Sequence, residues 1–373
     1  MMRSFDDAGI FSMRPLTVAA ASALFAALAL PGIAGPRLPR PAHFISAAPR
    51  PHLPRQARAG SNPRAPAVNE ADPAAQDLLK RMLQAENSLA LSGDQITTIA
   101  QNGLDISSEQ LVQRNGARAM RLDYLRPPRL AGEQIIDNGR FYCHLIPAKD
   151  TLELSPSRIQ TLRVRVPEII EQVRSGRLIV QGFGTDVIAG HLCGIVSVAA
   201  RSASPVPWRR FWIDPTNGAQ LRIEQYDAAG QLQSASHFTQ VTYNPVFDKA
   251  AFRVPHAGSK VIARGFGTPS LTLDQVRQQA GATWPVPMYL PEGFHYQAGS
   301  VSNLRDRRVV ELCYANGVNA LSVFQTPDSE GKTPEKTVHA RHGVLLGHQG
   351  GMKVVIIGNL PDGELEKVLA SLR

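Results

Sequence analysis

The chain has 373 residues, of which 43% are hydrophobic and 19% are charged, so it is long enough for two domains and too hydrophobic to be wholly disordered. Three cysteines are too few for a disulfide-dense scaffold. The formal net charge of +9 is concentrated at one end, because residues 1–64 contain eight arginines and only two acidic residues. The rest of the chain is close to neutral, which argues against a nucleic-acid-binding protein.

Residues 16–30 form an uncharged run, LTVAAASALFAALAL, between Arg14 and the helix-breaking Pro31-Gly32. The run is shorter than the about 20 residues that span a membrane. Its basic start, short apolar core and small residues at the end predict a secretory signal peptide over residues 1–34, with an uncleaved anchor as the alternative. An alternative start at Met13 would leave a short basic segment before the apolar core.

Residues 35–71 are rich in proline and arginine and poor in residues that form a core. This composition predicts a disordered linker, which either acts as a solvated tether or touches an anionic surface through its arginines.

The first regular element follows directly, because Asp72 is a good N-cap and Pro73 suits the first helical turn. Apolar residues at helical spacing then predict an amphipathic helix over residues 73–91.

Short β-like runs separated by turn residues fill residues 95–260. Hairpin turns are predicted at Asp137-Asn138-Gly139, Asn217-Gly218 and Asp227 to Gly230. A short helix that begins at Pro167 and ends before Gly176 interrupts the runs. Many hairpins with few helices predict an α+β domain over residues 72–262, in which helices cover one large antiparallel sheet.

A second, smaller α+β domain is predicted over residues 284–373, after a linker at residues 263–283. The linker is expected to contain at least one helical turn at 273–280. The small domain should then contain hairpins around Asn316-Gly317 and Gly350-Gly351 and a final helix at 362–372. Four strands and a covering helix make a unit of about 90 residues, which is within the range that folds alone.

The sequence contains no motif of a known hydrolase, P-loop NTPase or dinucleotide-binding enzyme. His339, His342 and His348 come closest to metal-ligand spacing, but a strand would place the first two on opposite faces, so no metal site and no cofactor are expected. We therefore predict a protein that is not an enzyme. An exported hydrolase of unrecognised type would need a nucleophile and a base, and no motif supplies that pair.

The cysteines lie in predicted strands. Cys143 and Cys193 belong to apolar strands of the large domain, and Cys313 to a strand of the small one. In an exported protein, Cys143 and Cys193 either form a disulfide or are two buried thiols that act as small hydrophobic residues. A disulfide would leave Cys313 as the unpaired cysteine.

Apolar residues alternate along the strands of the large domain. Leu192, Val196 and Val198 share one face of a strand, and Leu221 and Ile223 alternate in the same way further along the chain. Because the domain has few helices for its many strands, we predict that these residues line an apolar cavity completed by a ligand or partner. An ordinary core between sheet and helix is the alternative for each of them.

The large domain also carries a series of short motifs, best defined over residues 178–260. They are Val187 to Cys193 before a strand, the strand end Trp212-Ile213-Asp214, and the turns at Asn217-Gly218 and at Asp227 to Gly230. This series resembles the RseB/MucB regulators of the sigma-E envelope stress response. With Asn244-Pro245, Phe252 and Pro255, it is also similar to LolA-type lipoprotein carriers, whose half-barrel fold those regulators share.

Motifs in the small domain distinguish the RseB/MucB regulators from the LolA-type carriers. Thr283-Trp284-Pro285, Leu290 to Phe294 and Gly358 to Pro361 resemble the smaller domain of RseB/MucB, which LolA lacks. The arginine-rich segment at residues 35–71 is not part of the family pattern, and residues 95–165 match it only loosely.

The resemblance implies a LolA-like antiparallel half-barrel with covering helices and a small C-terminal α+β domain. It also implies a periplasmic regulator that binds the periplasmic region of a membrane-spanning anti-sigma factor. In this reading a lipid or acylated signal binds in the half-barrel and releases the anti-sigma factor, and Leu192, Val196, Val198, Leu221 and Ile223 are the expected lipid-binding residues. The alternative is a periplasmic lipid or lipoprotein carrier.

Overall fold

The computed structural model describes residues 72–101, 104–157, 159, 166–201, 207–248, 250–255, 260–263, 271–281, 284–304, 307–316, 319–328, 339–341, 344–358 and 360–373. The predicted signal peptide at residues 1–34 and the predicted linker at residues 35–71 lie outside the described residues. The described chain forms two sheets, one of twelve strands and one of six. Within it, no helix is long and apolar enough to cross a membrane.

The twelve-stranded sheet consists of two antiparallel meanders joined edge to edge. Strands β1–β6 and β7–β11 each follow chain order, and β1 pairs with β11 to join them. Strand β12 pairs with β6 at the far edge and runs parallel to it. The strands are β1 (Ala90–Gln101), β2 (Leu104–Asn115), β3 (Ala119–Arg126), β4 (Gln134–Asp137), β5 (Phe141–Ile146), β6 (Thr151–Pro156), β7 (Leu178–Ile188), β8 (His191–Ala200), β9 (Trp208–Ile213), β10 (Gln220–Tyr226), β11 (Leu232–Tyr243) and β12 (Lys260–Ala263).

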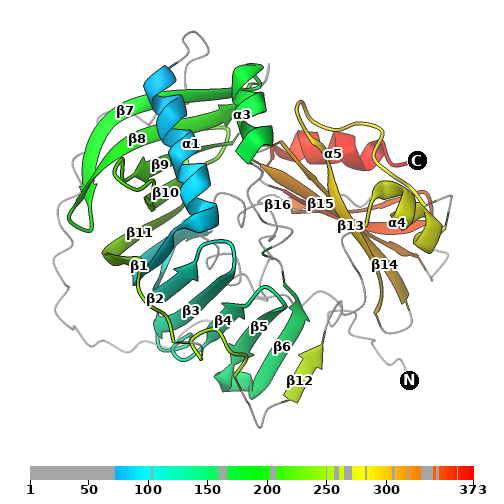
Figure 1. The fold of residues 1–373 in the computed structure, drawn as a ribbon. Helices are drawn as coiled ribbons and strands as arrows, with labels where there is room; N and C mark the ends of the chain where they lie inside the picture. Colours follow the sequence, from blue (N-terminus) through cyan, green and yellow to red (C-terminus); the bar gives the residue numbers. More distant parts are fainter. Residues whose placement is uncertain are drawn as a thin grey trace, which may run out of the picture.

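The sheet bends round from β7 to β12 without closing, which gives an open half-barrel (Figure 1). Two helices, α1 (Pro73–Ser88) and α3 (Val166–Arg174), pack against β7 and its neighbours. We call the face of the sheet that α1 covers the inner face.

Helix α1 begins where the sequence predicts, because the Asp72 carboxylate accepts a hydrogen bond from the backbone N–H of Ala75 at 2.9 Å. The same carboxylate accepts a bond from the N–H of Gly182 on β7 at 2.8 Å, which ties the start of the helix to the sheet. The helix ends at Ser88, three residues earlier than expected, since the chain enters β1 at Ala90.

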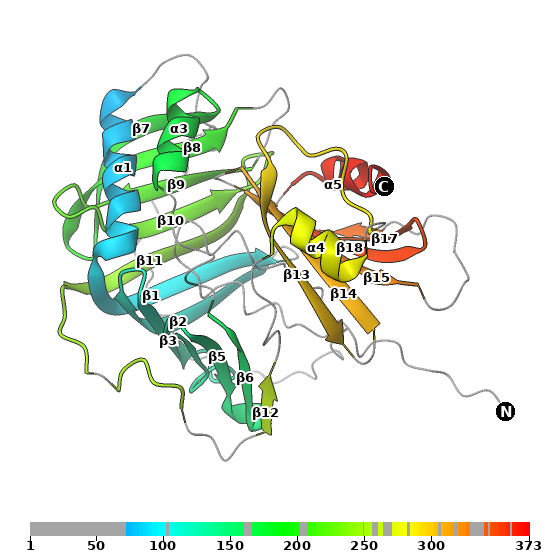
Figure 2. The same ribbon diagram turned by 45° about the vertical axis from the view of Figure 1, so that its right-hand side comes forward.

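The small sheet has the order β13-β14-β15-β18-β17-β16. Its strands are β13 (His295–Leu304), β14 (Arg307–Ala315), β15 (Ala320–Pro327), β16 (His339–Arg341), β17 (Val344–Gln349) and β18 (Met352–Gly358). Helices α4 (Leu273–Ala280) and α5 (Asp362–Ala370) cover it (Figure 2). Buried side chains of both helices and of the sheet form one core, which includes Val276, Leu365, Leu312 and Ile356.

The predicted α+β architecture is confirmed, including the half-barrel, its covering helices and the small C-terminal domain. The small sheet differs from expectation in having six strands instead of four. The segment predicted as a linker at residues 263–283 contributes α4 to the core of the small domain. The backbone groups of Leu271, just before that helix, exchange two hydrogen bonds with Gly299 on β13.

Candidate functional site

Helix α1 and the inner face of the half-barrel enclose an apolar core. Leu79, Met82 and Leu83 of α1 are at most 1% exposed and pack against side chains of β7–β10 and α3. The helix approaches the sheet closely, since a Cβ atom on Gly194 of β8 would lie 2.5 Å from the Leu78 side chain. The helix therefore occupies this part of the inner face, and a ligand would have to displace it.

The structure brings three of the five predicted lining residues together. Val196, Val198 and Ile223 are buried in the core beneath α1. Leu221 is also buried, but it belongs to the neighbouring cluster that continues towards β1 and β3. Leu192 stands apart, since it is 59% exposed beside its cross-strand partner Val187, which is equally exposed at the end of the β7–β8 hairpin. The assignment of these residues to lipid binding stays a prediction.

The inner face changes character where the helices no longer cover it. On β1, β2 and β11 it carries buried polar side chains, which are Gln95, Thr97, Ser108, Gln110 and Ser236. The Gln110 amide donates to Oε1 of Gln95 at 3.0 Å and to the Thr97 hydroxyl at 2.7 Å. The Thr97 and Ser236 hydroxyls lie 2.8 Å apart and share a hydrogen bond. This part of the half-barrel is polar and internally hydrogen-bonded.

Sequence reasoning did not identify this polar cluster. A signal was present, because β1 and β2 contain the segments QITT and SSEQ, which are polar on both faces of the strand. Polar strand residues usually indicate a solvent-exposed face, whereas Gln95, Thr97, Ser108 and Gln110 are buried on the inner face.

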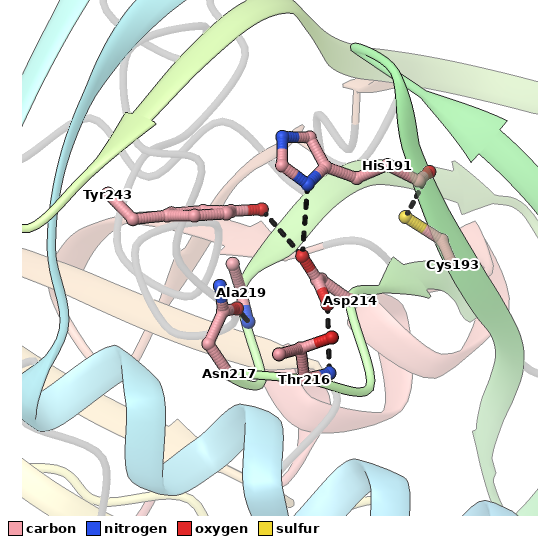
Figure 3. A network of polar contacts seen from close by, with 7 residues as sticks. All are labelled: His191, Cys193, Asp214, Thr216, Asn217, Ala219 and Tyr243. Atoms are coloured by element: carbon pink, nitrogen blue, oxygen red, sulfur yellow. Dashed lines mark hydrogen bonds and ion pairs between the residues drawn. The ribbon is translucent and has the colours of Figure 1, made fainter.

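A second polar network holds one rim of the half-barrel (Figure 3). One carboxylate oxygen of Asp214 accepts a hydrogen bond from the Tyr243 hydroxyl at 2.9 Å and lies 3.3 Å from Nδ1 of His191. The other accepts a bond from the N–H of Thr216 at 2.8 Å. Burial and the bond to Asp214 raise the pKa of Tyr243, so the phenol keeps its proton. The network joins three segments of the sheet: His191 lies at the start of β8, Asp214 at the start of the turn after β9, and Tyr243 at the end of β11.

Cys193 lies beside this network, but the arrangement does not resemble a nucleophilic triad. The Cys193 thiol contacts the backbone carbonyl of His191, at 3.5 Å, while the imidazole of His191 points towards Asp214 (Figure 3). Burial raises the pKa of the Cys193 thiol to about 11, so it is not a thiolate at neutral pH. The network therefore has the features of a structural support for the rim.

Cys143 and Cys193 are both free thiols and belong to separate buried clusters. This corresponds to the second of the two sequence interpretations, in which each cysteine packs as a small hydrophobic residue. Cys313 is also free and partly exposed. Among the described residues, no three His, Cys, Asp or Glu side chains are grouped so that they could hold a metal ion.

The two domains meet at a turn of the small sheet. The Asn319 side-chain amide, between β14 and β15, donates a hydrogen bond of 3.2 Å to the carbonyl of Pro207, which precedes β9 of the large sheet. Asn319 is 2% exposed. The contact is therefore a buried polar link between the half-barrel and the small domain.

No protein-family profile matches the sequence, and no curated protein matches it. Solved structures do match. A complex of MucB with MucA(peri) is 19% identical, with a TM-score of 0.57, and the match covers 80% of this chain and 98% of that one. The Pseudomonas aeruginosa MucA/MucB complex gives a TM-score of 0.58 at 19% identity, over 80% of this chain and 98% of that chain. MucB alone gives 0.55 at 19% identity, over 81% and 98%.

These matches extend over both sheets, since they cover about four fifths of the chain. The fold therefore defines a two-domain protein, a half-barrel followed by a small α+β domain. That combination is the fold of MucB, and the resemblance to the RseB/MucB family predicted from the sequence is confirmed at the level of the fold.

Proposed function

We propose that this chain is a non-enzymatic regulator that binds the exported region of a membrane-spanning anti-sigma factor. The main support is the match to MucB in its complexes with MucA, which covers both domains and 98% of the MucB chain. The buried thiol beside His191 and the structural character of the Asp214 network agree with a role in binding instead of catalysis.

A periplasmic location is part of the proposal. It is supported by the sequence of residues 1–34, which has the basic start, apolar core and small-residue end of a secretory signal. The arginine-rich residues 35–71 would then lie outside the inner membrane, where an anionic envelope surface or an acidic peptide is a suitable partner.

We further propose that a lipid or acylated signal acts through the half-barrel. The apolar core beneath α1 offers the environment that an acyl chain requires, and burial of each CH₂ group contributes about 0.8 kcal/mol. Because α1 fills this region, acyl binding would be coupled to displacement of the helix. Such a signal would release the anti-sigma factor only if it binds the free regulator more tightly than the complex.

The proposal is tested by capture of the anti-sigma factor. The full chain is immobilised and offered the exported segment of the single-span protein encoded beside a sigma factor in the same genome. Retention of that segment, and its release by an acylated lipid, is the expected result. A peptide of the same composition in scrambled order is the control.

The alternative function, a lipid or lipoprotein carrier, predicts a different outcome. Co-purification with lipoproteins and no retention of the anti-sigma segment would contradict the regulator proposal and favour the carrier. If the chain retains the anti-sigma segment but no lipid releases it, the proposed partner is supported and only the proposed lipid signal is contradicted.

A further inference from the structure

A row of polar side chains crosses the inner face of the half-barrel from β1 to β6. Register places its members side by side: Gln95 opposite Gln110, Gln110 opposite Tyr124, and His144 opposite Glu153. Glu133 fills the position between Tyr124 and His144, because its carbonyl accepts a hydrogen bond from the N–H of Tyr124. We call these six residues the inner polar row.

The centre of the row is buried but incompletely hydrogen-bonded. Tyr124 is 3% exposed and Glu133 is 5% exposed. One oxygen of Glu133, Oε2, lies 2.9 Å from Nε2 of His144. Among the residues that the structure describes, the other oxygen, Oε1, and the Tyr124 hydroxyl have no hydrogen-bond partner. Leaving a buried polar group unpaired costs about 1–3 kcal/mol, and more for a charged one, so a ligand that pairs both atoms would be stabilised.

The chemistry of the two atoms restricts that ligand. An ionised carboxylate oxygen only accepts hydrogen bonds. Burial is the main cause that raises the pKa of Tyr124, and electrostatic interactions with Tyr142 and Glu133 add to it. The Tyr124 hydroxyl therefore remains neutral and can both donate and accept a hydrogen bond. A group that carries positive charge and at least two N–H donors fits best, which means an ammonium or a guanidinium.

The rest of the row defines how that group can approach Glu133. Gln95 and Gln110 continue it at the spacing of adjacent strands, about 4.8 Å. Their carboxamides are buried and bond to each other and to Thr97 and Ser108, so they form one wall of the site and leave Glu133 and Tyr124 as its contacts. Towards β5 and β6 the row is less buried, since His144 and Glu153 are partly exposed, and a side chain would reach Glu133 from there.

We propose that the inner polar row is a binding site for a basic side chain, arginine or lysine, of a partner peptide, with Glu133 and Tyr124 as its contacts. The inference deepens the proposed function, and rests on it for the choice of a peptide as the source of the basic group. The site itself stands on the burial and the unpaired atoms of this chain.

The test uses peptides unrelated to any anti-sigma factor. Fluorescein-labelled heptapeptides Gly-Ser-Gly-X-Gly-Ser-Gly, with X as arginine, lysine or the uncharged arginine analogue citrulline, are titrated with the full chain and followed by anisotropy. We expect the arginine and lysine peptides to bind about tenfold more tightly than the citrulline peptide, since hydrogen bonds to charged groups are the stronger ones.

Variants assign the effect to the row. Glu133→Gln keeps the shape of the side chain but removes the charge, and should weaken binding of the arginine peptide about tenfold. Tyr124→Phe removes one hydroxyl and should weaken it less. Glu171→Gln is the matched control, because that carboxylate is exposed on α3 beside Arg174, and it should bind as the wild type does.

Equal binding of the arginine and citrulline peptides by the wild-type chain would overturn the proposal, and this comparison does not depend on any variant folding. Undiminished binding by a folded Glu133→Gln chain would overturn it too. Tighter binding of free spermidine than of any peptide would overturn the assignment to a peptide. Because these peptides share nothing with an anti-sigma segment, failure here leaves the capture experiment unaffected, and failure of that experiment leaves this one unaffected.

Discussion

Asp214 is the residue on which the rim of the half-barrel depends most. Its carboxylate is 5% exposed and receives hydrogen bonds from Thr216 and Tyr243 in addition to the contact with His191. Asp214→Ala removes the common partner of three groups, of which the Tyr243 hydroxyl is partly buried, so we expect the large domain to lose about 2 kcal/mol of stability in urea unfolding. Asp77→Ala, which breaks an exposed ion pair with Arg81, should cost no more than about 0.5 kcal/mol. Similar losses for the two variants would contradict the structural role of the network.

His237 gives the large domain a dependence on pH. Burial on β11, and secondarily the positive charge of Arg222, lower the pKa of His237 below its ordinary value of 6.5. The unfolded chain then binds a proton more readily than the folded one, so the stabilising contribution is complete above pH 6.5 and is lost as the pH falls towards the folded pKa. We expect the free energy of unfolding to be lower at pH 5.0 than at pH 7.5.

The variant His237→Gln should reduce that difference, whereas His295→Gln, at an exposed position on β13, should leave it unchanged. Urea titrations at the two pH values measure both. An unchanged difference in His237→Gln would show that other groups cause the pH dependence.

Individual residues also show where a sequence pattern stops being informative. Alternation places Leu192 on the face of Val196 and Val198, yet Leu192 lies beyond the helix and is 59% exposed. Burial depends on whether α1 reaches a position, and strand alternation contains no information on that. The inner polar row was missed for the same reason, since polar residues in a strand are read as exposed unless the covering layer is known.

At the scale of elements, the turn between β9 and β10 supports α1. Gly218 in that turn has φ of +78°, and a Cβ atom there would lie 2.6 Å from the carbonyl oxygen of Arg81 on the helix. Gly190, in the turn between β7 and β8, has a similar φ of +81° but nothing within 4 Å of its Cβ position. Alanine at Gly190 therefore tests only the strain of the left-handed backbone, whereas alanine at Gly218 tests that strain together with the clash against α1.

We expect Gly190→Ala to destabilise the large domain by about 1 kcal/mol, which is the penalty of a left-handed conformation. Gly218→Ala adds a clash with helix backbone and should cost about 3 kcal/mol in total. Thermal unfolding followed by circular dichroism measures both. Equal shifts in the two variants would mean that the helix does not rest on the turn.

Elements specified by local sequence were predicted well, and elements specified by distant contacts were not. The turns at Asn217-Gly218 and Gly350-Gly351 lie between paired strands as expected, because turn chemistry and register are local properties. The pairing of β1 with β11 joins residues about 140 positions apart and has no local signal. The parallel addition of β12 to β6 and the short strand β16 are set by the same kind of tertiary context.

At the scale of the whole molecule, the two domains have separate cores, and the hydrogen bond from Asn319 to Pro207 links them. The small domain buries its own cluster between its sheet, α4 and α5, and the large domain buries its clusters on the half-barrel. A regulator that must hold a partner and release it requires two arrangements that differ by little energy. In the proposed regulator, the junction between the domains is where we expect such a change, because interfaces between domains commonly allow relative motion.

The buried bond from Asn319 to Pro207 tests this view of the junction. Asn319→Ala removes the donor and leaves the Pro207 carbonyl unpaired, so we expect a loss of about 1–3 kcal/mol. Because the bond joins the two domains, the unfolding transitions of both should move to lower temperature in differential scanning calorimetry. Asn303→Ala, at an exposed position on β13, should move neither. The bond from the backbone N–H of Asn319 to the Asn316 side chain is kept in this variant. A shift confined to the small domain would therefore show that the Asn319 side chain stabilises only its own domain and that the two domains are not coupled there.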